Sequence, residues 1–134
     1  MTAHFKRYIL LADDDDDDQD LLMESILQRH PSATIKTVNN GQQVLAWLDG
    51  CPDEQLPAML ILDYKMPLLN AAQVLDELNA KGRYAGLPTV VWSTSSNRSH
   101  IEECLRKGAL KYFPKPTNVA ELDVITESIL SLFD

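Results

Sequence analysis

The stretch AMLIL, residues 58–62, contains five apolar residues in a row and is followed at once by an aspartate. A continuous apolar run of this length is typical of a β-strand that helices cover on both faces. The runs YILLA at 8–12 and TVVW at 89–92 have the same character. The runs ATIKTV at 33–38 and ALKYF at 109–113 bring the number of predicted strands to five.

The segments after these runs carry apolar residues at helical spacing. The predicted helices cover residues 21–28 (LLMESILQ), 44–48 (VLAWL), 71–78, 101–105 and 119–132, and Gly108 is placed to end the fourth. A strand followed by a helix, five times over, predicts an α/β fold with a parallel sheet. Because no linker or internal repeat divides the chain, residues 1–134 are predicted to form a single domain.

Charge and proline mark the strands that lie at the edges of the predicted sheet. Lys36 lies in the run 33–38, and Lys111 lies in the run 109–113, with Pro114 directly after it. Charged residues and proline suit edge strands. Placing these two strands at the edges gives the strand order 2-1-3-4-5, the flavodoxin-like doubly wound (βα)5 arrangement. In that arrangement, ligands bind at the carboxyl ends of strands 1 and 3.

Composition limits the kinds of partner that the protein can have. The chain has 134 residues, of which 45% are hydrophobic, an ordinary share for a globular domain. Its 12 basic and 20 acidic residues give a formal net charge of −8, which argues against non-specific binding to nucleic acid or to an anionic membrane. No apolar run is long enough to span a membrane, and the first residues lack the features of a signal peptide. We therefore expect a cytoplasmic protein.

Polar side chains follow four of the five predicted strands. Because carboxyl ends of parallel strands share one edge of a sheet, these side chains are expected to meet. They are Asp13 and Asp14, Asp63, Ser93 and Thr94, and Lys115. Carboxylates held this close repel one another, which raises the pKa of some of them unless a cation binds. Mg²⁺ is the natural choice, because it binds through few carboxylates and keeps positions for water or phosphate oxygens.

A magnesium site beside an ammonium and a hydroxyl group is suited to hold a phosphoryl group. The metal and the lysine neutralise charge on the phosphoryl oxygens, and the hydroxyl donates to one of them. One of the aspartates can then act as a nucleophile and form an acyl phosphate. The residues alone do not decide which aspartate does so.

Taken together, four stretches of the chain resemble the response-regulator receiver domain of two-component signalling. They are the acidic pair after YILLA, the stretch LILDYKMP, the stretch VVWSTSS and the stretch GALKYFPKP. The resemblance extends over essentially the whole chain. It implies that Asp63 is the phosphoacceptor, and that Mg²⁺ is held by Asp13, Asp14, Asp63 and the backbone carbonyl of Lys65. It also implies phosphate-binding and switch roles for Ser93, Thr94, Lys115 and Tyr112, the last being the aromatic side chain that changes rotamer on activation.

The same resemblance implies that the chain is a signalling domain rather than an enzyme. The phosphoryl group is expected to come from a phosphohistidine on a sensor histidine kinase or a histidine phosphotransfer protein. The surface formed by the fourth helix, the fifth strand and the fifth helix is then expected to bind a downstream protein or a second copy of the chain. Such a domain can catalyse its own phosphorylation and dephosphorylation. No output domain follows in the sequence, so a stand-alone receiver is expected.

Three residues depart from the pattern of the family. Ala71 stands where the family usually has glycine, so the loop before it is expected to differ in shape. Lys65 puts a cation next to the acyl phosphate, and Pro114 precedes Lys115. The Lys115–Pro116 bond is left open between cis and trans. None of these changes removes a chemical group, so phosphorylation is expected to survive with altered kinetics.

Three alternatives remain open. Asp13, Asp15, Asp17 and Glu24 match positions 1, 3, 5 and 12 of a calcium-binding EF-hand loop, although Asp18 stands where that loop needs glycine. An apolar strand followed by Asp-x-Asp also opens magnesium-dependent phosphatases of the haloacid dehalogenase type, in which Asp13 would be the nucleophile. The third alternative is a receiver-like module that binds a partner without phosphorylation. Within the acidic run, residues 16–18 are expected to lead into the first helix, where the helix dipole favours acids.

Overall fold

Five parallel strands form the sheet at the centre of the computed structural model, which describes residues 7–133. The strand order is β2-β1-β3-β4-β5, as predicted. The strands are β1 (Tyr8–Ala12), β2 (Thr34–Val38), β3 (Met59–Asp63), β4 (Thr89–Ser93) and β5 (Lys111–Pro114). The predicted β3 and β4 each end one residue early, because their last residues, Asp63 and Ser93, are polar and do not extend an apolar run.

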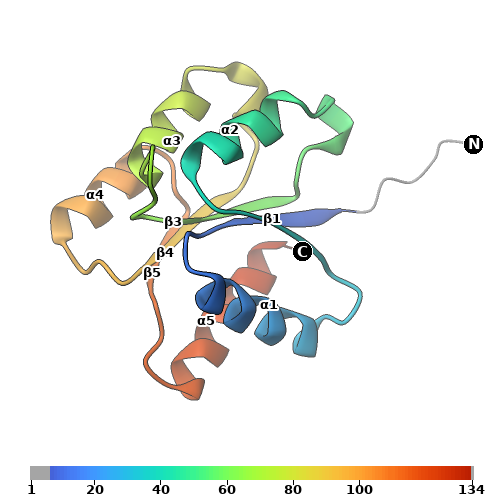
Figure 1. Cartoon of the computed structure of the whole chain (residues 1–134), viewed down its shortest axis with the longest axis vertical. Helices are drawn as coiled ribbons and strands as arrows, with labels where there is room; N and C mark the ends of the chain where they lie inside the picture. The colour runs from blue at the N-terminus through green and yellow to red at the C-terminus, as the bar shows by residue number, and fades with distance from the viewer. Residues whose placement is uncertain (1–6, 134) are drawn as a thin grey trace, which may run out of the picture.

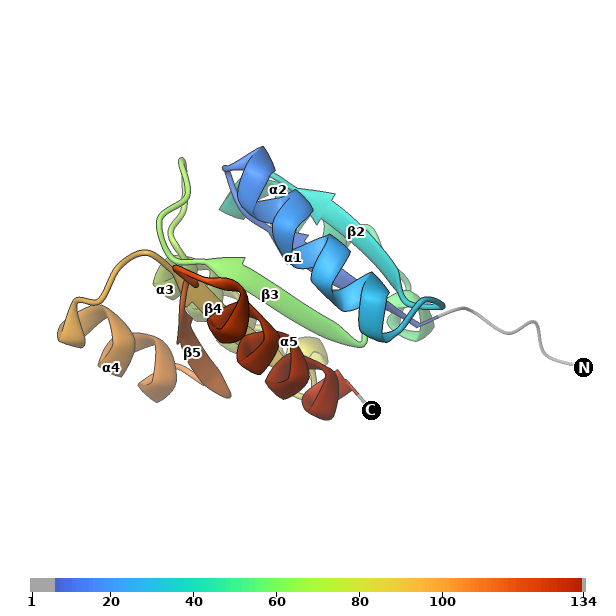
Figure 2. The same ribbon diagram turned by 90° about the horizontal axis from the view of Figure 1, so that it is seen from below.

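Helices cover both faces of this sheet (Figure 1). They are α1 (Asp16–Arg29), α2 (Gly41–Asp49), α3 (Ala71–Asn79), α4 (Arg98–Arg106) and α5 (Val119–Phe133), with short 3₁₀ turns at Asp53–Gln55 and Gly82–Tyr84. The helices α2, α3 and α4 pack on one face, while α1 and α5 lie side by side on the other (Figure 2). This is the doubly wound architecture, so the predicted fold class is confirmed. None of the helices in the described part of the chain has both the length and the hydropathy that a membrane crossing requires.

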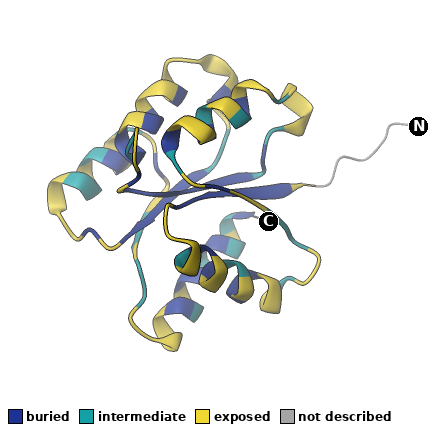
Figure 3. Ribbon diagram, viewed as in Figure 1, coloured by how far each residue is buried: buried dark blue, intermediate teal, exposed yellow. Residues whose placement is uncertain are grey.

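The core consists of two apolar layers, one on each side of the sheet. Every residue of β1, β3 and β4 is buried, as expected for strands covered on both faces (Figure 3). The edge strands are more open, and Lys36 in β2 and Lys111 in β5 are exposed. Fully buried side chains such as Trp92 and Leu22 fill the layer under α1 and α5. The three central strands are thereby held rigidly, and their carboxyl ends are fixed relative to one another.

Helix α1 begins five residues earlier than the apolar pattern predicts. The side chain of Asp15 caps it by accepting hydrogen bonds from the backbone N–H groups of Asp17 and Asp18. The first turn is wholly acidic, which the helix dipole favours, so apolar spacing alone cannot detect it. Polar caps also start α2 and α4 before their first apolar residue, at Asn40 and Asn97. The predicted end of α4 is confirmed, since Gly108 follows it with a φ of 109°.

The loop between β3 and α3 has an unusual backbone. Leu68 has a φ of 74°, the one non-glycine residue with a positive φ in residues 7–133. The loop ends at Asn70, which caps α3 in a reciprocal pair with Gln73, and Ala71 is buried as the first helical residue. The loop is packed from the other side by Gly41, where a Cβ atom would lie 2.6 Å from Leu69. No cis peptide bond occurs in the described chain, so the Lys115–Pro116 bond is trans.

We expect the substitution Leu68→Asn to raise the free energy of unfolding by about 0.5–1 kcal/mol, because asparagine tolerates the left-handed region that leucine adopts at a cost. Little packing is lost, since Leu68 is 65% exposed. Urea unfolding of the two proteins measures the difference. The matched control is Leu110→Asn, at a leucine that is 51% exposed and has an ordinary φ. Equal effects at the two positions would show that backbone strain is not the cause.

Candidate functional site

The register of the sheet brings the predicted site residues together. Ala12 in β1 pairs with Leu62 in β3, so Asp13 and Asp63 follow at the same level. Asp63 pairs in turn with Trp92, which places Ser93 one residue beyond. Ser93 pairs with Pro114 of β5, and Lys115 follows directly. Parallel pairing therefore gathers an acid from each of two strands, a hydroxyl and an ammonium at one edge.

Asp13 is fully buried, and hydrogen bonds to its side chain and its backbone hold it in place. Its Oδ1 accepts a hydrogen bond of 2.9 Å from the backbone N–H of Asp15. The buried side chain of Gln19 donates to the backbone carbonyl of Asp13 at 2.6 Å and to that of Val38 at 3.0 Å. These contacts fix the carboxylate of Asp13 at the carboxyl end of β1, facing β3.

Asp63 is 4% exposed and lies between a cation and a second carboxylate. Burial and, to a smaller extent, the charge of Asp13 raise its pKa to about 7, although Lys115 opposes both effects. The ion pair from Lys115 Nζ to Asp63 Oδ2 measures 3.2 Å. Without further positive charge, the negative charge on Asp63 is thus costly in this site.

Lys115 contacts three carboxylates at once. Its Nζ atom lies 2.7 Å from Asp18 Oδ2, 2.9 Å from Asp13 Oδ2 and 3.2 Å from Asp63 Oδ2. Burial alone would lower the pKa of Lys115, but its bonds to Asp18 and Asp13 outweigh burial and hold that pKa above its ordinary value. The ammonium also lies 5.1 Å from the centre of the Trp92 ring. Lys115 is therefore a fixed cation at the carboxyl ends of β1 and β3.

The acidic residues at this edge fit a divalent cation. Asp13, Asp14 and Asp63 offer oxygen atoms that all lie within 4.8 Å of one another. Oδ2 of Asp13 is buried and accepts no hydrogen bond from the described residues, although the ammonium of Lys115 lies nearby. A hard cation with oxygen ligands would satisfy that atom and reduce the repulsion among the carboxylates. Asp14 is exposed and gives the cluster access to solvent. The side chain of Lys65 is exposed, and its backbone carbonyl stays a predicted ligand.

The predicted switch residues lie in the loop after β4. The hydroxyl of Ser93 is buried and accepts a 3.1 Å hydrogen bond from the backbone N–H of Ser95. The hydroxyl of Tyr112 donates to the backbone carbonyl of Ser95 at 2.9 Å. Thr94 is exposed. Ser93 and Tyr112 are thus joined through Ser95, a residue that the sequence pattern did not single out.

Sequence reasoning missed two further side chains. Asp18 was expected only to favour the start of α1, yet it makes the shortest contact of Lys115. His100 stacks on Tyr64, the residue after Asp63, with ring centres 4.2 Å apart and an interplanar angle of 13°, and its Nδ1 lies 2.9 Å from Ser95 Oγ. No sequence motif predicts either contact. Only the position of Asp18 in the first turn of a helix that starts beside the site could have suggested it.

The calcium-loop alternative does not fit this geometry. Asp13 directly follows strand β1, Asp15 is the cap of α1, and Asp17 and Glu24 both lie within α1. Seven residues along one helix separate Asp17 from Glu24, so these residues do not form a loop around one ion.

Comparisons with known proteins agree with the observed fold. The sequence model of the response regulator receiver domain matches residues 9–127. Two-component response regulator ARR8 of Arabidopsis thaliana is 26% identical over 137 residues, which cover 91% of this chain and 60% of the relative. Two-component response regulator ORR12 of Oryza sativa subsp. japonica is 31% identical over 103 residues, which cover 77% of this chain and 82% of the relative. The chain spans between 54 and 60% of the length of four such plant relatives.

Solved structures share the same arrangement. The phosphorylated cyanobacterial phytochrome response regulator RcpA superposes with a TM-score of 0.84 at 24% identity, covering 96% of this chain and 94% of that one. Response regulator RPA3017, from red light signalling of R. palustris, has a TM-score of 0.74 at 29% identity, covering 94% and 91%. Since the family match spans nearly the whole described chain and the fold agrees, this protein belongs to the response regulator receiver domain family of two-component systems.

Proposed function

We propose that Asp63 accepts a phosphoryl group from a phosphohistidine on a sensor histidine kinase or a histidine phosphotransfer protein. The observation that carries this proposal is the meeting of Asp63 with Asp13, Asp14 and Lys115 at the carboxyl ends of β1 and β3. Asp63 lies at the end of a buried strand and has a fixed cation beside it, as a carboxylate nucleophile for phosphoryl transfer requires. The proposed setting is the cytoplasm, where the chain acts as a signalling domain rather than an enzyme.

In the proposed reaction, an oxygen of Asp63 attacks phosphorus, a P–O bond forms, and the P–N bond to the donor histidine breaks. Asp63 must be ionised to attack, and its raised pKa of about 7 leaves that ionisation incomplete near neutral pH without added positive charge. Mg²⁺, held by Asp13, Asp14 and Asp63, would supply that charge. Lys115 then moves its N–H groups from the carboxylates to the phosphoryl oxygens, and Ser93 donates its hydroxyl to another of them.

The loop after β4 connects this chemistry to the surface. A hydroxyl of Ser93 that turns to the phosphoryl group gives up its bond with the N–H of Ser95. Tyr112 is bonded to the carbonyl of the same Ser95, so the two residues respond together. Because Tyr112 lies in β5, the change reaches the surface formed by α4, β5 and α5.

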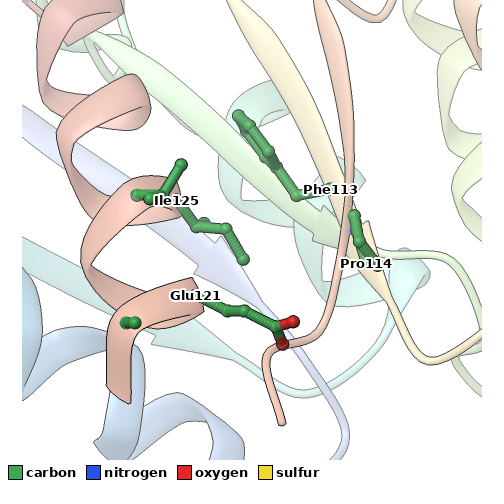
Figure 4. Close-up of a pocket in the computed structure, with 6 residues that line it drawn as sticks. Phe113, Pro114, Glu121 and Ile125 are labelled. Carbon is green, nitrogen blue, oxygen red and sulfur yellow. The ribbon is translucent and has the colours of Figure 1, made fainter. Parts of the chain in front are cut away.

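The surface formed by α4, β5 and α5 has an apolar groove between β5 and α5, with a volume of about 410 Å³ (Figure 4). Val119 and Val124 on α5 are 73% and 68% exposed. The residues that line the groove are Phe113, Pro114, Ala120, Glu121, Val124 and Ile125. We propose that this face binds the downstream protein or a second copy of the chain, because exposed apolar patches mark interaction sites.

Asp63→Asn is expected to reduce phosphoryl incorporation to background, because the amide cannot act as the nucleophile. The purified protein is incubated with Mg²⁺ and acetyl phosphate, and its intact mass is measured for the gain of one phosphoryl group. Asp20→Asn, at an exposed aspartate of α1, is the control and should incorporate as the unmodified chain does.

Two outcomes would contradict the proposal in different ways. A phosphoryl group that persists in Asp63→Asn and is lost in Asp13→Asn would identify Asp13 as the nucleophile, as in the phosphatase alternative. No adduct on the unmodified chain, from acetyl phosphate or from any phosphohistidine donor tested, would favour the module that binds without phosphorylation.

A further inference from the structure

Asp18 is the closest partner of Lys115, although the chemistry proposed above does not use it. The Lys115 Nζ atom donates to Asp18 Oδ2 at 2.7 Å, a contact between residues 97 positions apart in the sequence. The side chain of Lys115 is 9% exposed and that of Asp18 is 31% exposed, so this ion pair is largely shielded from water. Shielded, charge-assisted bonds of this length are among the strong ones in proteins.

The start of α1 fixes the carboxylate of Asp18 in this place. Asp15 caps the helix and accepts the backbone N–H of Asp18 at 3.1 Å. The backbone N–H of Asp15 in turn donates to Asp13 Oδ1. Asp18 is thereby linked, through one helical turn, to the buried acid at the end of β1. The carboxylate of Asp18 is therefore carried by a capped helix rather than by a loop.

The other two partners of Lys115 are needed elsewhere when a metal binds. The oxygens that face the ammonium are Oδ2 of Asp13 and Oδ2 of Asp63, and both residues belong to the acidic cluster that fits a divalent cation. A cation bound there would compete with Lys115 for the same carboxylates and would repel it. Asp18 does not belong to that cluster. It is the one carboxylate among the three that can keep Lys115 while the others bind metal.

Resting on the proposed function, we propose that Asp18 is a positioning residue that holds Lys115 beside Asp63 while Mg²⁺ occupies Asp13 and Asp63. When the metal binds, Asp18 would draw the ammonium toward α1 and away from the Oδ2 atoms of Asp13 and Asp63, which Lys115 contacts in this structure. It also keeps the ammonium from leaving the site altogether, so that Lys115 stays ready for the phosphoryl oxygens. Without the charge of Asp18, Asp13 and Asp63 are the remaining carboxylates that Lys115 contacts, so the ammonium competes there with the metal.

The acidic run itself provides the matched control. Asp17 precedes Asp18 in the same turn of α1, is exposed, and has no contact with Lys115 among those found in the described chain. Asp17→Asn and Asp18→Asn remove the same charge from the same helix, so both lose the same favourable interaction with the helix dipole. A difference between the two variants therefore reports the contact of Asp18 with Lys115.

The experiment is calorimetric titration of Mg²⁺ into the unphosphorylated protein at fixed ionic strength. Asp18→Asn is expected to weaken Mg²⁺ binding by about five- to tenfold, the net size of one ordinary hydrogen bond. Asp17→Asn is expected to weaken it by less than about twofold, because an exposed charge is screened. Asp18→Glu, which retains a carboxylate, should recover most of the affinity. In the background of Lys115→Met, Asp18→Asn should have no larger effect than Asp17→Asn.

Equal Mg²⁺ affinities of Asp17→Asn and Asp18→Asn would overturn the inference, as would an effect of Asp18→Asn that persists without Lys115. If Lys115→Met does not fold, the recovery by Asp18→Glu decides instead, and failure to recover overturns the inference. Phosphorylation of the unmodified chain is measured in parallel. Normal phosphoryl incorporation with equal affinities rejects only the role of Asp18. No incorporation together with the expected affinities rejects the proposed function and leaves the ion-pair exchange standing.

Discussion

Lys115→Met is expected to lower the free energy of unfolding at pH 7.5 by about 3–5 kcal/mol, the usual cost of removing one partner from a buried ion pair. Asp13 and Asp63 are 0% and 4% exposed and would lose the cation that compensates their charge. The effect should shrink at pH 5.5, because Asp63, with a pKa already raised to about 7, is then neutralised by protonation. Urea unfolding at the two pH values measures both quantities.

Lys107→Met serves as the control for the loss of a lysine. Lys107 pairs with Asp76 at 2.8 Å and with Glu103 at 3.5 Å, but these acids are 56% and 35% exposed and can be solvated by water. Its removal is expected to cost less than about 1 kcal/mol. If both lysine variants lost the same stability, or if the loss in Lys115→Met were the same at both pH values, the account of a buried carboxylate cluster would be wrong.

Asp63→Asn is expected to raise the free energy of unfolding at pH 8 by about 2–4 kcal/mol. Burial and the charge of Asp13 raise the pKa of Asp63 from 3.8 to about 7, so its ionised form is unfavourable in the folded protein. Between about pH 4 and pH 7 the folded chain binds a proton that the unfolded chain releases. Stability therefore falls as the pH rises through this window, and the asparagine variant avoids that loss.

The measurement is chemical unfolding of both proteins at several pH values without divalent cations. The difference between them should be small at pH 4 and grow until about pH 7. Asp20→Asn, at an exposed position, should follow the unmodified chain at every pH. A constant difference between Asp63→Asn and the unmodified chain would mean that titration of Asp63 is not its source.

The sheet and the cluster of polar side chains at the carboxyl ends of its strands were predictable because they depend on features that repeat along the chain. Three continuous apolar runs identified the strands buried on both faces, and charge and proline identified the two edges. Parallel register then required the residues after those strands to meet. The meeting of Asp13, Asp63 and Lys115 follows from that register and from no longer-range information.

What the sequence could not provide were contacts that depend on side-chain direction. The first turn of α1 contains no apolar residue, so its start at Asp16 depends on the cap by Asp15. Which of the six consecutive aspartates faces Lys115 is decided by the rotation of the helix about its axis. A run of identical residues gives no indication of that rotation. The stacking of Tyr64 on His100 joins the loop after β3 to helix α4, and these segments are adjacent only in the folded chain.

Pro114, the last residue of β5, affects how copies of this protein associate. The backbone N–H of Lys115 donates to the carbonyl of Ser93 in β4. Backbone nitrogens of successive residues in a strand point to opposite sides, so the nitrogen of Pro114 faces away from the sheet. Proline has no hydrogen there, and the exposed side chain of Lys111 adds charge at the other end of this four-residue strand. The open edge is thus a poor template for adding a further strand, which protects a concentrated solution from forming fibrils through β5. Partners that approach this side are left to recognise side chains rather than the peptide backbone.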